Sequence, residues 1–352
     1  MKLKIGSVTN PKIILFTPYF KQNRGNATTA RRLIKGLKLW NASIRVFAYE
    51  EEEWNSEWDA FFLEADIYHV IHLKRFSQWL KRYPHLSLRK PYILTSGGTD
   101  VNEDLKNPDA VHLMMSVADE SCGITVFSED GKNKIVQTYP ELADRIYVIP
   151  QSVDFPNREN QPSTVEPKGG YPRFLLPAGL RPVKDVLYVV DELKTLRDIW
   201  SELTFTIIGP VLDEDVYQQV LKYEKTHEWF RYIKEIPLEQ MIPVYQSCDF
   251  VLNTSVSEGQ SSAVLEAMAL EKPVIARMNS GNASVISDGT TGVLFDTPQQ
   301  FYIKAQELLA SKDKQKRMLE QAKMYINEHH SLEKEMEQLF GVYEHCLSKA
   351  SV

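Results

Sequence analysis

The chain contains 352 residues, of which 43% are hydrophobic and 25% are charged, and its formal net charge is -6 at pH 7. This composition is typical of a globular protein, the length favours two domains, and the negative charge argues against a dedicated nucleic-acid-binding protein. No stretch approaches 18 consecutive apolar residues and the N-terminus lacks the features of a signal peptide, so we expect neither a transmembrane helix nor secretion. The three cysteines are far apart, which predicts reduced thiols in a cytoplasmic protein.

The first 155 residues alternate between short apolar runs and amphipathic helical patterns. The predicted strands are residues 13–16, 44–48, 67–73, 92–95, 124–127 and 146–149. The predicted helices are residues 28–39, 54–64, 75–83, 109–121 and 130–139. Strands that alternate with helices in this way are typical of a parallel sheet covered by helices on both faces.

Residues 156–173 are rich in proline, glycine and polar side chains, which predicts a linker between domains. The alternation then begins again, with strands predicted at residues 174–178, 205–208, 232–236, 250–253, 274–276 and 293–295. Helices are predicted at residues 186–199, 214–226, 238–247, 261–270 and 299–310, and the last ~40 residues are helical throughout. We therefore predict two α/β domains, residues 1–155 and 156–330, each a Rossmann-like, doubly wound parallel sheet. Two such domains facing each other form a cleft, with ligands beyond the carboxyl ends of the strands.

A loop with a carboxylate, and then a helix, follow the predicted strand 250–253. Glu258 and Gly259 lie in this loop, where a carboxylate accepts hydrogen bonds from hydroxyl groups and glycine permits close approach of a ligand. The helix that begins near Ser261 offers backbone N–H groups to an anion. Within it, Glu266 lies among apolar residues and needs a partner, either a distant side chain or a ligand. The segment is either a site for a phosphate flanked by polyol hydroxyls, as in a nucleotide-sugar, or a structural arrangement in which Glu258 caps the helix and Glu266 pairs with an arginine.

The segment SEGQSSAVLEAMALEKPVIA resembles the signature of retaining GT-B glycosyltransferases, especially glycosyltransferase family 4, in which seven residues separate two glutamates. The segment NSGNASVISDGTTGVLFD resembles the loop, turn and strand that follow this signature in the family. The resemblance implies the GT-B fold, in which the last helix, about residues 331–352, packs back onto the first domain.

The resemblance also implies roles for particular residues. By analogy with the family, Glu258 binds the transferred sugar and Glu266 binds the ribose of the nucleotide. The residues implied to hold the sugar or the phosphate through their backbone are Gly259, Gln260, Ser261 and Ser262. The family commonly has Gly-aromatic-Gly where this chain has GQS, so the sequence leaves the identity of the sugar open.

The segment PAGLRPVKD places Arg181 and Lys184 beyond the carboxyl end of a predicted strand. In the family an arginine and a lysine in this loop stabilise the departing nucleoside diphosphate, although their spacing is usually longer. Fixed cations lower the barrier of sugar transfer, because the leaving phosphate gains negative charge that they stabilise. Ordinary surface charges are the alternative interpretation. Gly209, which follows the predicted strand 205–208, is expected to line the nucleotide pocket.

Two segments of the first half also resemble the family. The segment RGN follows the first predicted strand, and the resemblance implies that Gly25 and Asn26 contact donor phosphate or acceptor. The segment TSGGTD implies substrate contacts for Gly98 and Thr99 and places Asp100 near the sugar or the acceptor. The alternatives are a plain connecting loop for the first segment and a helix cap or turn for Asp100.

Other polar patterns do not predict a metal site. Asp213 opens a predicted helix and is expected to cap it. His69 and His72 lie three positions apart on a predicted strand and therefore face opposite sides. A solvated face is the favoured interpretation of the basic side chains on the first helix, with contact to anionic lipid at a membrane surface or to a phosphorylated acceptor as the alternative. These side chains are Arg31, Arg32, Lys35 and Lys38.

The sequence thus predicts a glycosyltransferase that moves a sugar from a nucleoside-diphosphate sugar to an acceptor hydroxyl. By resemblance, the reaction retains anomeric configuration and uses no metal or other cofactor. The residues expected to be catalytic are Arg181, Lys184, Glu258 and Asp100. The alternatives are a non-catalytic GT-B protein that binds nucleotide-sugars and a nucleotide-sugar epimerase of the same fold. The acceptor is a glycan, a lipid-linked compound or a small molecule, and the sequence specifies neither it, nor the donor, nor the oligomeric state.

Overall fold

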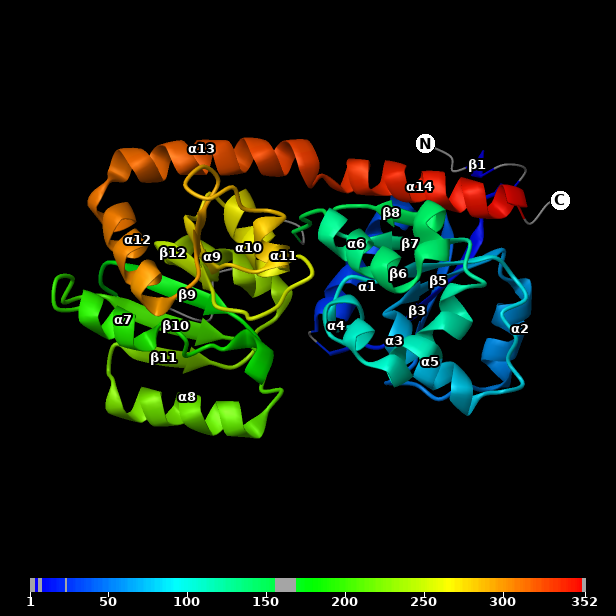
Figure 1. Ribbon diagram of the computed structural model, residues 1–352, viewed down its shortest axis with the longest axis horizontal. Coiled ribbons are helices and arrows are strands. Elements are labelled where there is room, and N and C mark those ends of the chain that lie inside the picture. The colour runs from blue at the N-terminus through cyan, green and yellow to red at the C-terminus, as the bar shows by residue number, and fades with distance from the viewer. Residues whose placement is uncertain (1–3, 6–7, 23, 156–168, 350–352) are drawn as a thin grey trace. The chain divides into compact units, whose positions relative to one another are not determined.

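The computed structural model describes residues 4–5, 8–22, 24–155 and 169–349, and Figure 1 shows their helices and strands. The chain divides into two compact units. The first unit comprises Met1–Ser152 and Ser331–Val352, and the second comprises Val153–His330. Residues 156–168, most of the predicted linker, lie outside the described residues. The C-terminal residues therefore belong to the same unit as the N-terminal half.

The first unit is built on a six-stranded parallel sheet with the strand order β4-β3-β5-β6-β7-β8. Its strands are β3 (Lys12–Thr17), β4 (Ser43–Ala48), β5 (Ile67–Ile71), β6 (Tyr92–Thr95), β7 (Gly123–Val126) and β8 (Ile146–Val148). A separate antiparallel pair joins β1 (Lys4–Ile5) to β2 (Val8–Thr9). The strand order reverses between β3 and β5, because β4 lies on the other side of β3. In doubly wound sheets the ligand lies outside the carboxyl ends of the strands at such a reversal.

Seven α-helices in the described residues belong to the first unit. They are α1 (Gly25–Leu39), α2 (Ser56–Glu64), α3 (Leu73–Arg82), α4 (Thr99–Asn102), α5 (Pro108–Ala118), α6 (Glu129–Thr138) and α14 (Leu332–Lys349), with the 3-10 turns η1 (Asp104–Lys106) and η2 (Pro140–Arg145). The side chains of Asn55, Asn107 and Ser128 accept hydrogen bonds from N–H groups in the first turns of α2, α5 and α6. These caps explain why the three helices begin close to their predicted starts.

Alternate residues of β3 pack on opposite faces of the first sheet. Ile14 and Phe16 belong to a buried cluster with residues of α2, α3, α5 and α6. Ile13 and Leu15 pack against α1 and α14 instead. Gly36 lies against Met336 of α14, so the side chain of this methionine would have to shift if position 36 carried a Cβ atom. The C-terminal helix therefore completes the core of the first unit.

A buried ion pair also joins α1 to α14. The Nε atom of Arg32 lies 2.9 Å from Oε2 of Glu335, and the two side chains are only 5% and 4% exposed. The same carboxylate accepts hydrogen bonds from the backbone N–H and the hydroxyl of Ser152, and Arg32 also donates to Gln151. The prediction of a solvated face is therefore wrong for Arg32, because α14 covers it, whereas Lys35 is exposed.

The second unit repeats the architecture with the strand order β11-β10-β9-β12-β13-β14 in a second parallel sheet. Its strands are β9 (Arg173–Pro177), β10 (Thr204–Ile208), β11 (Phe230–Ile233), β12 (Phe250–Asn253), β13 (Val274–Arg277) and β14 (Val293–Phe295). Its helices are α7 (Val190–Leu196), α8 (Glu214–Thr226), α9 (Met241–Ser247), α10 (Ser262–Ala269), α11 (Ser280–Ala283), α12 (Pro298–Ala310) and α13 (Lys312–His329), with the turns η3 (Pro182–Lys184) and η4 (Leu238–Gln240). Here the order reverses between β9 and β12.

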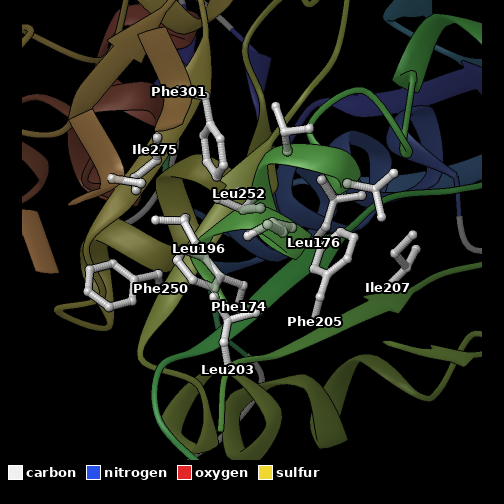
Figure 2. Close-up of a cluster of buried hydrophobic side chains, with 14 of the residues drawn as sticks. Phe174, Leu176, Leu196, Leu203, Phe205, Ile207, Phe250, Leu252, Ile275 and Phe301 are labelled. Carbon is white, nitrogen blue, oxygen red and sulfur yellow. The ribbon is translucent and has the colours of Figure 1, made fainter. Parts of the chain in front are cut away.

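Both faces of the second sheet are also covered. Figure 2 shows one face, where Phe174, Leu176, Phe205 and Phe250 lie in a buried cluster with residues of α7, α8 and α12. Leu175 points to the opposite face and packs with residues of α9, α10 and α13. The predicted architecture of two doubly wound, Rossmann-like α/β sheets is thereby confirmed. Within the described ranges, we find no helix that is both long and apolar enough to span a bilayer.

Strand β5 and helix α7 are among the predicted elements that are shorter than expected, and local backbone conformation explains both. Strand β5 ends at Ile71 because His72 has a φ of 73° and leaves the extended region. Helix α7 begins at Val190 instead of residue 186. Before it, the chain forms the turn η3, and Asp185 then has a φ of 41°. Both departures from regular structure occur beyond the carboxyl ends of strands at a reversal of strand order.

Candidate functional site

The loops that follow β9 and β12 are joined to each other at the reversal of strand order in the second unit. The two strands are hydrogen-bonded neighbours. The hydroxyl of Thr254 donates to the backbone carbonyl of Lys184 at 2.9 Å, and the backbone N–H of Val256 donates to that of Val183 at the same distance. Side chains from both loops therefore lie at the place where a doubly wound sheet binds its ligand.

Lys184 and Glu258 form an ion pair at this place. Lys184 Nζ lies 2.5 Å from Glu258 Oε1, and the two side chains are 16% and 11% exposed. The same oxygen accepts hydrogen bonds from Ser255 Oγ at 2.7 Å and from Asn253 Nδ2 at 3.2 Å. Burial acts to raise the pKa of Glu258, but the Lys184 ammonium and these hydrogen bonds outweigh it and lower the pKa below its ordinary value. An ammonium and an ionised carboxylate are therefore held side by side.

A second set of contacts fixes the loop that carries Lys184. Arg181 precedes the turn η3, and its carbonyl accepts a hydrogen bond from the N–H of Lys184 at 2.9 Å. Asp185 follows the turn and accepts from Arg277 Nη1 at 2.8 Å. The Arg277 guanidinium also stacks 3.6 Å from the ring centroid of Tyr188. The position of Lys184 is thus defined by contacts on both sides of it.

The start of α10 is held by the same asparagine that contacts Glu258. Asn253 Nδ2 donates to Ser261 Oγ at 3.0 Å, so Ser261 precedes the helix without capping it through its side chain. Gly281 on α11 packs directly on the loop, because a Cβ atom there would lie 2.4 Å from the carbonyl oxygen of Glu258. Glu258 and Ser261 are therefore both held by contacts with neighbouring elements.

Glu266 has a side-chain partner on another helix. Tyr245 Oη on α9 donates to Glu266 Oε2 at 2.7 Å. Burial, together with the charge of Glu266, raises the pKa of Tyr245 well above its ordinary value, so the phenol keeps its proton and remains a donor. Glu266 itself is half-buried. The carboxylate is therefore held in one orientation, on the helix that follows the Glu258 loop.

Gly209 lies at the end of β10, next to the loop that carries Arg181. A Cβ atom at this position would lie 2.2 Å from the carbonyl oxygen of Ala178, so only glycine fits without a shift of the backbone. The hydroxyl of Tyr232 donates to the carbonyl of Gly209 at 2.7 Å. Gly209 therefore brings the ends of two strands close together beside the candidate site.

The candidate residues of the first half lie on the first unit. Gly25 and Asn26 begin α1, while Gly98 and Thr99 lie at the start of α4. Asp100 is 2% exposed. Its carboxylate accepts backbone N–H groups of Gly98, Val101 and Leu73 at 3.0, 3.2 and 3.1 Å. These contacts match the interpretation of Asp100 as a turn residue, and they join α4 to the first residue of α3.

The sequence presents His72 only as half of a poor metal pair with His69, yet its position in the structure marks it as a candidate site residue. It follows β5 with a left-handed backbone conformation and is 5% exposed. Its Nε2 atom lies 3.2 Å from Thr99 Oγ1, and Nδ1 lies 3.8 Å from Asp100 Oδ2. Burial lowers the pKa of His72, with Asp100 opposing the shift, so the imidazole is neutral at pH 7. Unusual backbone conformations of this kind cluster at functional sites.

The rejected metal patterns have structural roles. His69 is fully buried and contacts Tyr343 Oη and Thr95 Oγ1, both at 2.7 Å, so it does not pair with His72. Asp213 caps α8 through the N–H of Val216, as predicted. Over the described part of the chain, no group of three or more His, Cys, Asp or Glu side chains is arranged to hold a metal ion.

Comparison with known proteins identifies a family model for part of the chain and one relative that spans nearly all of it. Residues 157–325 match the family model "Glycosyl transferases group 1". The chain is 30% identical over 337 residues to "Glycosyltransferase 1 domain-containing protein 1" of Xenopus tropicalis, covering 92% of this chain and 94% of that protein. It is 26% identical over 211 residues to a probable sucrose-phosphate synthase of Thermosipho melanesiensis, covering 55% of this chain and 49% of the relative.

Solved structures share the fold at low sequence identity. Anabaena Alr3699/HepE, solved in complex with UDP-glucose, superposes with a TM-score of 0.75 and 14% identity, covering 97% of this chain and 100% of that one. Sucrose-phosphate synthase from Thermosynechococcus elongatus superposes with a TM-score of 0.73 and 12% identity, covering 96% and 100%. The predicted GT-B fold is therefore confirmed. With a relative that is 30% identical over nearly its full length, the chain belongs to the glycosyl transferases group 1 family.

Proposed function

We propose that the protein transfers a sugar from a nucleoside-diphosphate sugar to an acceptor hydroxyl, with retention of anomeric configuration and without a metal or other cofactor. The Lys184–Glu258 pair carries this proposal. A carboxylate accepts hydrogen bonds from sugar hydroxyls, and an ammonium donates hydrogen bonds to phosphate oxygens. Because Lys184 Nζ and Glu258 Oε1 are 2.5 Å apart, a donor that contacts both has its sugar–phosphate linkage beside them.

The proposed reaction breaks the bond between the anomeric carbon and the β-phosphate oxygen and forms a bond to the acceptor oxygen on the same face of the sugar. The acceptor proton passes to the leaving phosphate. Lys184 and Arg181 stabilise the negative charge that develops on this phosphate, the role that a metal ion has in other enzymes. Glu258 orients the sugar through its hydroxyl groups.

Glu266 is proposed to bind the ribose hydroxyls, with Tyr245 fixing the orientation of its carboxylate. The sugar or the phosphate is proposed to be held by Gly259, Gln260, Ser261 and Ser262. Gly209 is proposed to line the nucleotide pocket. On the first unit, Gly25, Asn26, Gly98 and Thr99 are proposed to bound the acceptor, with Asp100 shaping this region through its backbone contacts. The neighbour solved with UDP-glucose supports this choice of donor class.

A thermal-shift panel of nucleoside diphosphates and their sugars tests the donor site. A ligand present at 100 times its dissociation constant stabilises the folded state by about 2.7 kcal/mol, which raises the melting temperature measurably. We expect at least one nucleotide to raise it, and Glu266→Ala to weaken nucleotide binding by about tenfold. Glu307→Ala, at an exposed glutamate of the same unit, is the control and should bind normally. The donor-site assignment would be wrong if no nucleotide shifted the melting temperature of the folded chain.

A further inference from the structure

Two arginines lie at the reversal of strand order in the first unit. Strands β3 and β5 are hydrogen-bonded neighbours there. Arg24 lies in the loop after β3, and Arg75 lies in the first turn of α3, which follows β5. Since the carboxyl ends of parallel strands meet at one edge of a sheet, both arginines belong to the place where a doubly wound sheet binds its ligand.

Both guanidinium groups contact the same aromatic ring. The Cζ atoms of Arg24 and Arg75 lie 4.1 and 5.5 Å from the ring centroid of Tyr19. Arg75 Nη1 also donates to Tyr19 Oη at 3.0 Å, and Arg24 Nε donates to Gln22 Oε1 at 2.8 Å. All three residues of the Arg24–Tyr19–Arg75 cluster are half-buried. These contacts hold two positive groups close together in defined orientations.

Among the described residues, no carboxylate forms an ion pair with either arginine of this cluster. Neither Arg24 nor Arg75 lies within salt-bridge distance of an acidic side chain in that part of the chain. The neighbouring carboxylates bond elsewhere: Asp104 pairs with a lysine, and Asp100 and Glu51 accept backbone N–H groups. Two like charges held near one ring repel each other, and a bound anion relieves that repulsion.

The loop that carries Tyr19 and Arg24 is fixed by Glu51. Its carboxylate accepts the backbone N–H groups of Phe20, Lys21 and Gln22 at 2.9, 2.9 and 3.0 Å. Burial acts to raise the pKa of Glu51, but these three hydrogen bonds outweigh it and lower the pKa, so the carboxylate is ionised at pH 7. Tyr19 directly precedes the three residues whose N–H groups bind Glu51. The ring that orients both arginines is therefore held in place by the protein itself.

We propose that Arg24, Tyr19 and Arg75 bind a phosphate group on the acceptor, so that the acceptor is a phosphorylated hydroxyl compound. The inference rests on the proposed function and names the acceptor class for it. Guanidinium groups present N–H donors in a fork that matches phosphate oxygens, and the two cations balance the charge of a phosphomonoester. A neutral acceptor would leave both guanidinium groups without an anionic partner. The donor diphosphate offers the same chemistry, so an experiment must separate the two sources.

Calorimetric titration of the full chain tests the proposal. The probes are inorganic phosphate, a panel of hexose monophosphates with their unphosphorylated parents, and a panel of nucleoside diphosphates. We expect at least one hexose monophosphate to bind at least about tenfold more tightly than its parent, since hydrogen bonds between charged groups are stronger than those between neutral groups. Arg24→Gln and Arg75→Gln should each remove most of this preference while nucleoside diphosphate affinity stays unchanged.

Arg45→Gln is the matched control. Arg45 is an exposed arginine of the first unit whose Cζ atom stacks 3.4 Å from the ring centroid of Phe61, away from the carboxyl ends of the strands. It should keep the preference for the hexose monophosphate. Equal melting temperatures of the three variants show that they fold.

Three results would overturn the phosphate subsite. The first is that neither inorganic phosphate nor any hexose monophosphate binds. The second is that the preference for a hexose monophosphate over its unphosphorylated parent survives both Arg24→Gln and Arg75→Gln. The third is a loss of nucleoside diphosphate affinity in these variants, which would assign the cluster to the donor. The wild-type nucleotide titration tests the proposed function separately. If nucleotides do not bind but hexose monophosphates bind through these arginines, the donor assignment fails and the phosphate subsite stands.

Discussion

The two units place different charges at equivalent positions of similar sheets. At the reversal in the second unit, Lys184 is paired with Glu258, and the charges cancel. At the reversal in the first unit, Arg24 and Arg75 share the ring of Tyr19, and among the described residues no carboxylate pairs with them. The fold sets where a ligand binds, but the loop side chains set what kind of ligand it is. The balanced pair suits a ligand with both hydroxyl and phosphate groups, and the cationic cluster suits an anion.

The buried pair Arg32–Glu335 provides a reference for this comparison, because it lies in the core contact of α1 with α14. Arg32→Met leaves the Glu335 carboxylate buried without its cation and should lower the free energy of unfolding by about 3–5 kcal/mol in urea titrations. The double variant Arg32→Met/Glu335→Met should recover part of this loss. Equal losses in the single and double variants would show that the pair is not the source of the effect. Nucleotide affinity should change in neither folded variant.

Lys184→Ala tests the balanced pair itself. The variant removes the cation proposed to stabilise the leaving phosphate, so the transfer rate should fall by about 10²–10³-fold, measured as release of nucleoside diphosphate. Lys323→Ala, at an exposed lysine of the same unit that pairs with Glu271, should keep the full rate. A normal transfer rate in Lys184→Ala would show that Lys184 only neutralises the charge of Glu258 and has no catalytic role.

A smaller effect than that of Lys184→Ala is expected for the contribution of Glu258 to the free energy of unfolding, which depends on pH. The folded-state pKa of Glu258 is lowered, so its contacts stabilise the fold above the ordinary carboxyl pKa, and this contribution is lost as the pH falls through the lowered value. Glu258→Gln should therefore be less stable than the wild type by about 1–2 kcal/mol at pH 7. The difference in melting temperature should shrink as the pH is lowered below the carboxyl range. A difference that is constant with pH, in comparison with Glu307→Gln as control, would contradict the ionised pair.

Much of the fold followed from local patterns in the sequence, because buried parallel strands require continuous apolar runs such as IILF and FVLN, and the cap predicted at Asp213 opens α8. The side-chain pairings did not follow. Lys184 and Glu258 lie 74 positions apart, and Arg32 and Glu335 lie 303 apart, so neither contact leaves a local signature. The basic charges of the first helix assigned Arg32 to solvent, because a charge pattern cannot show that a second helix covers that face. The left-handed conformation of His72 was equally invisible, since histidine carries no signal for it.

Sugar transfer by this protein is tested most directly by incubating the full chain with nucleoside-diphosphate sugars and a panel of hydroxyl acceptors that includes phosphorylated and neutral hexoses. Product anomers are assigned by proton NMR, and nucleoside diphosphate release is followed with and without acceptor. We predict acceptor-dependent release, with a product that has the anomeric configuration of the donor. A product of inverted configuration would contradict the retaining mechanism. Conversion of the donor to its epimer without an acceptor, or no turnover of any donor that binds, would contradict sugar transfer itself.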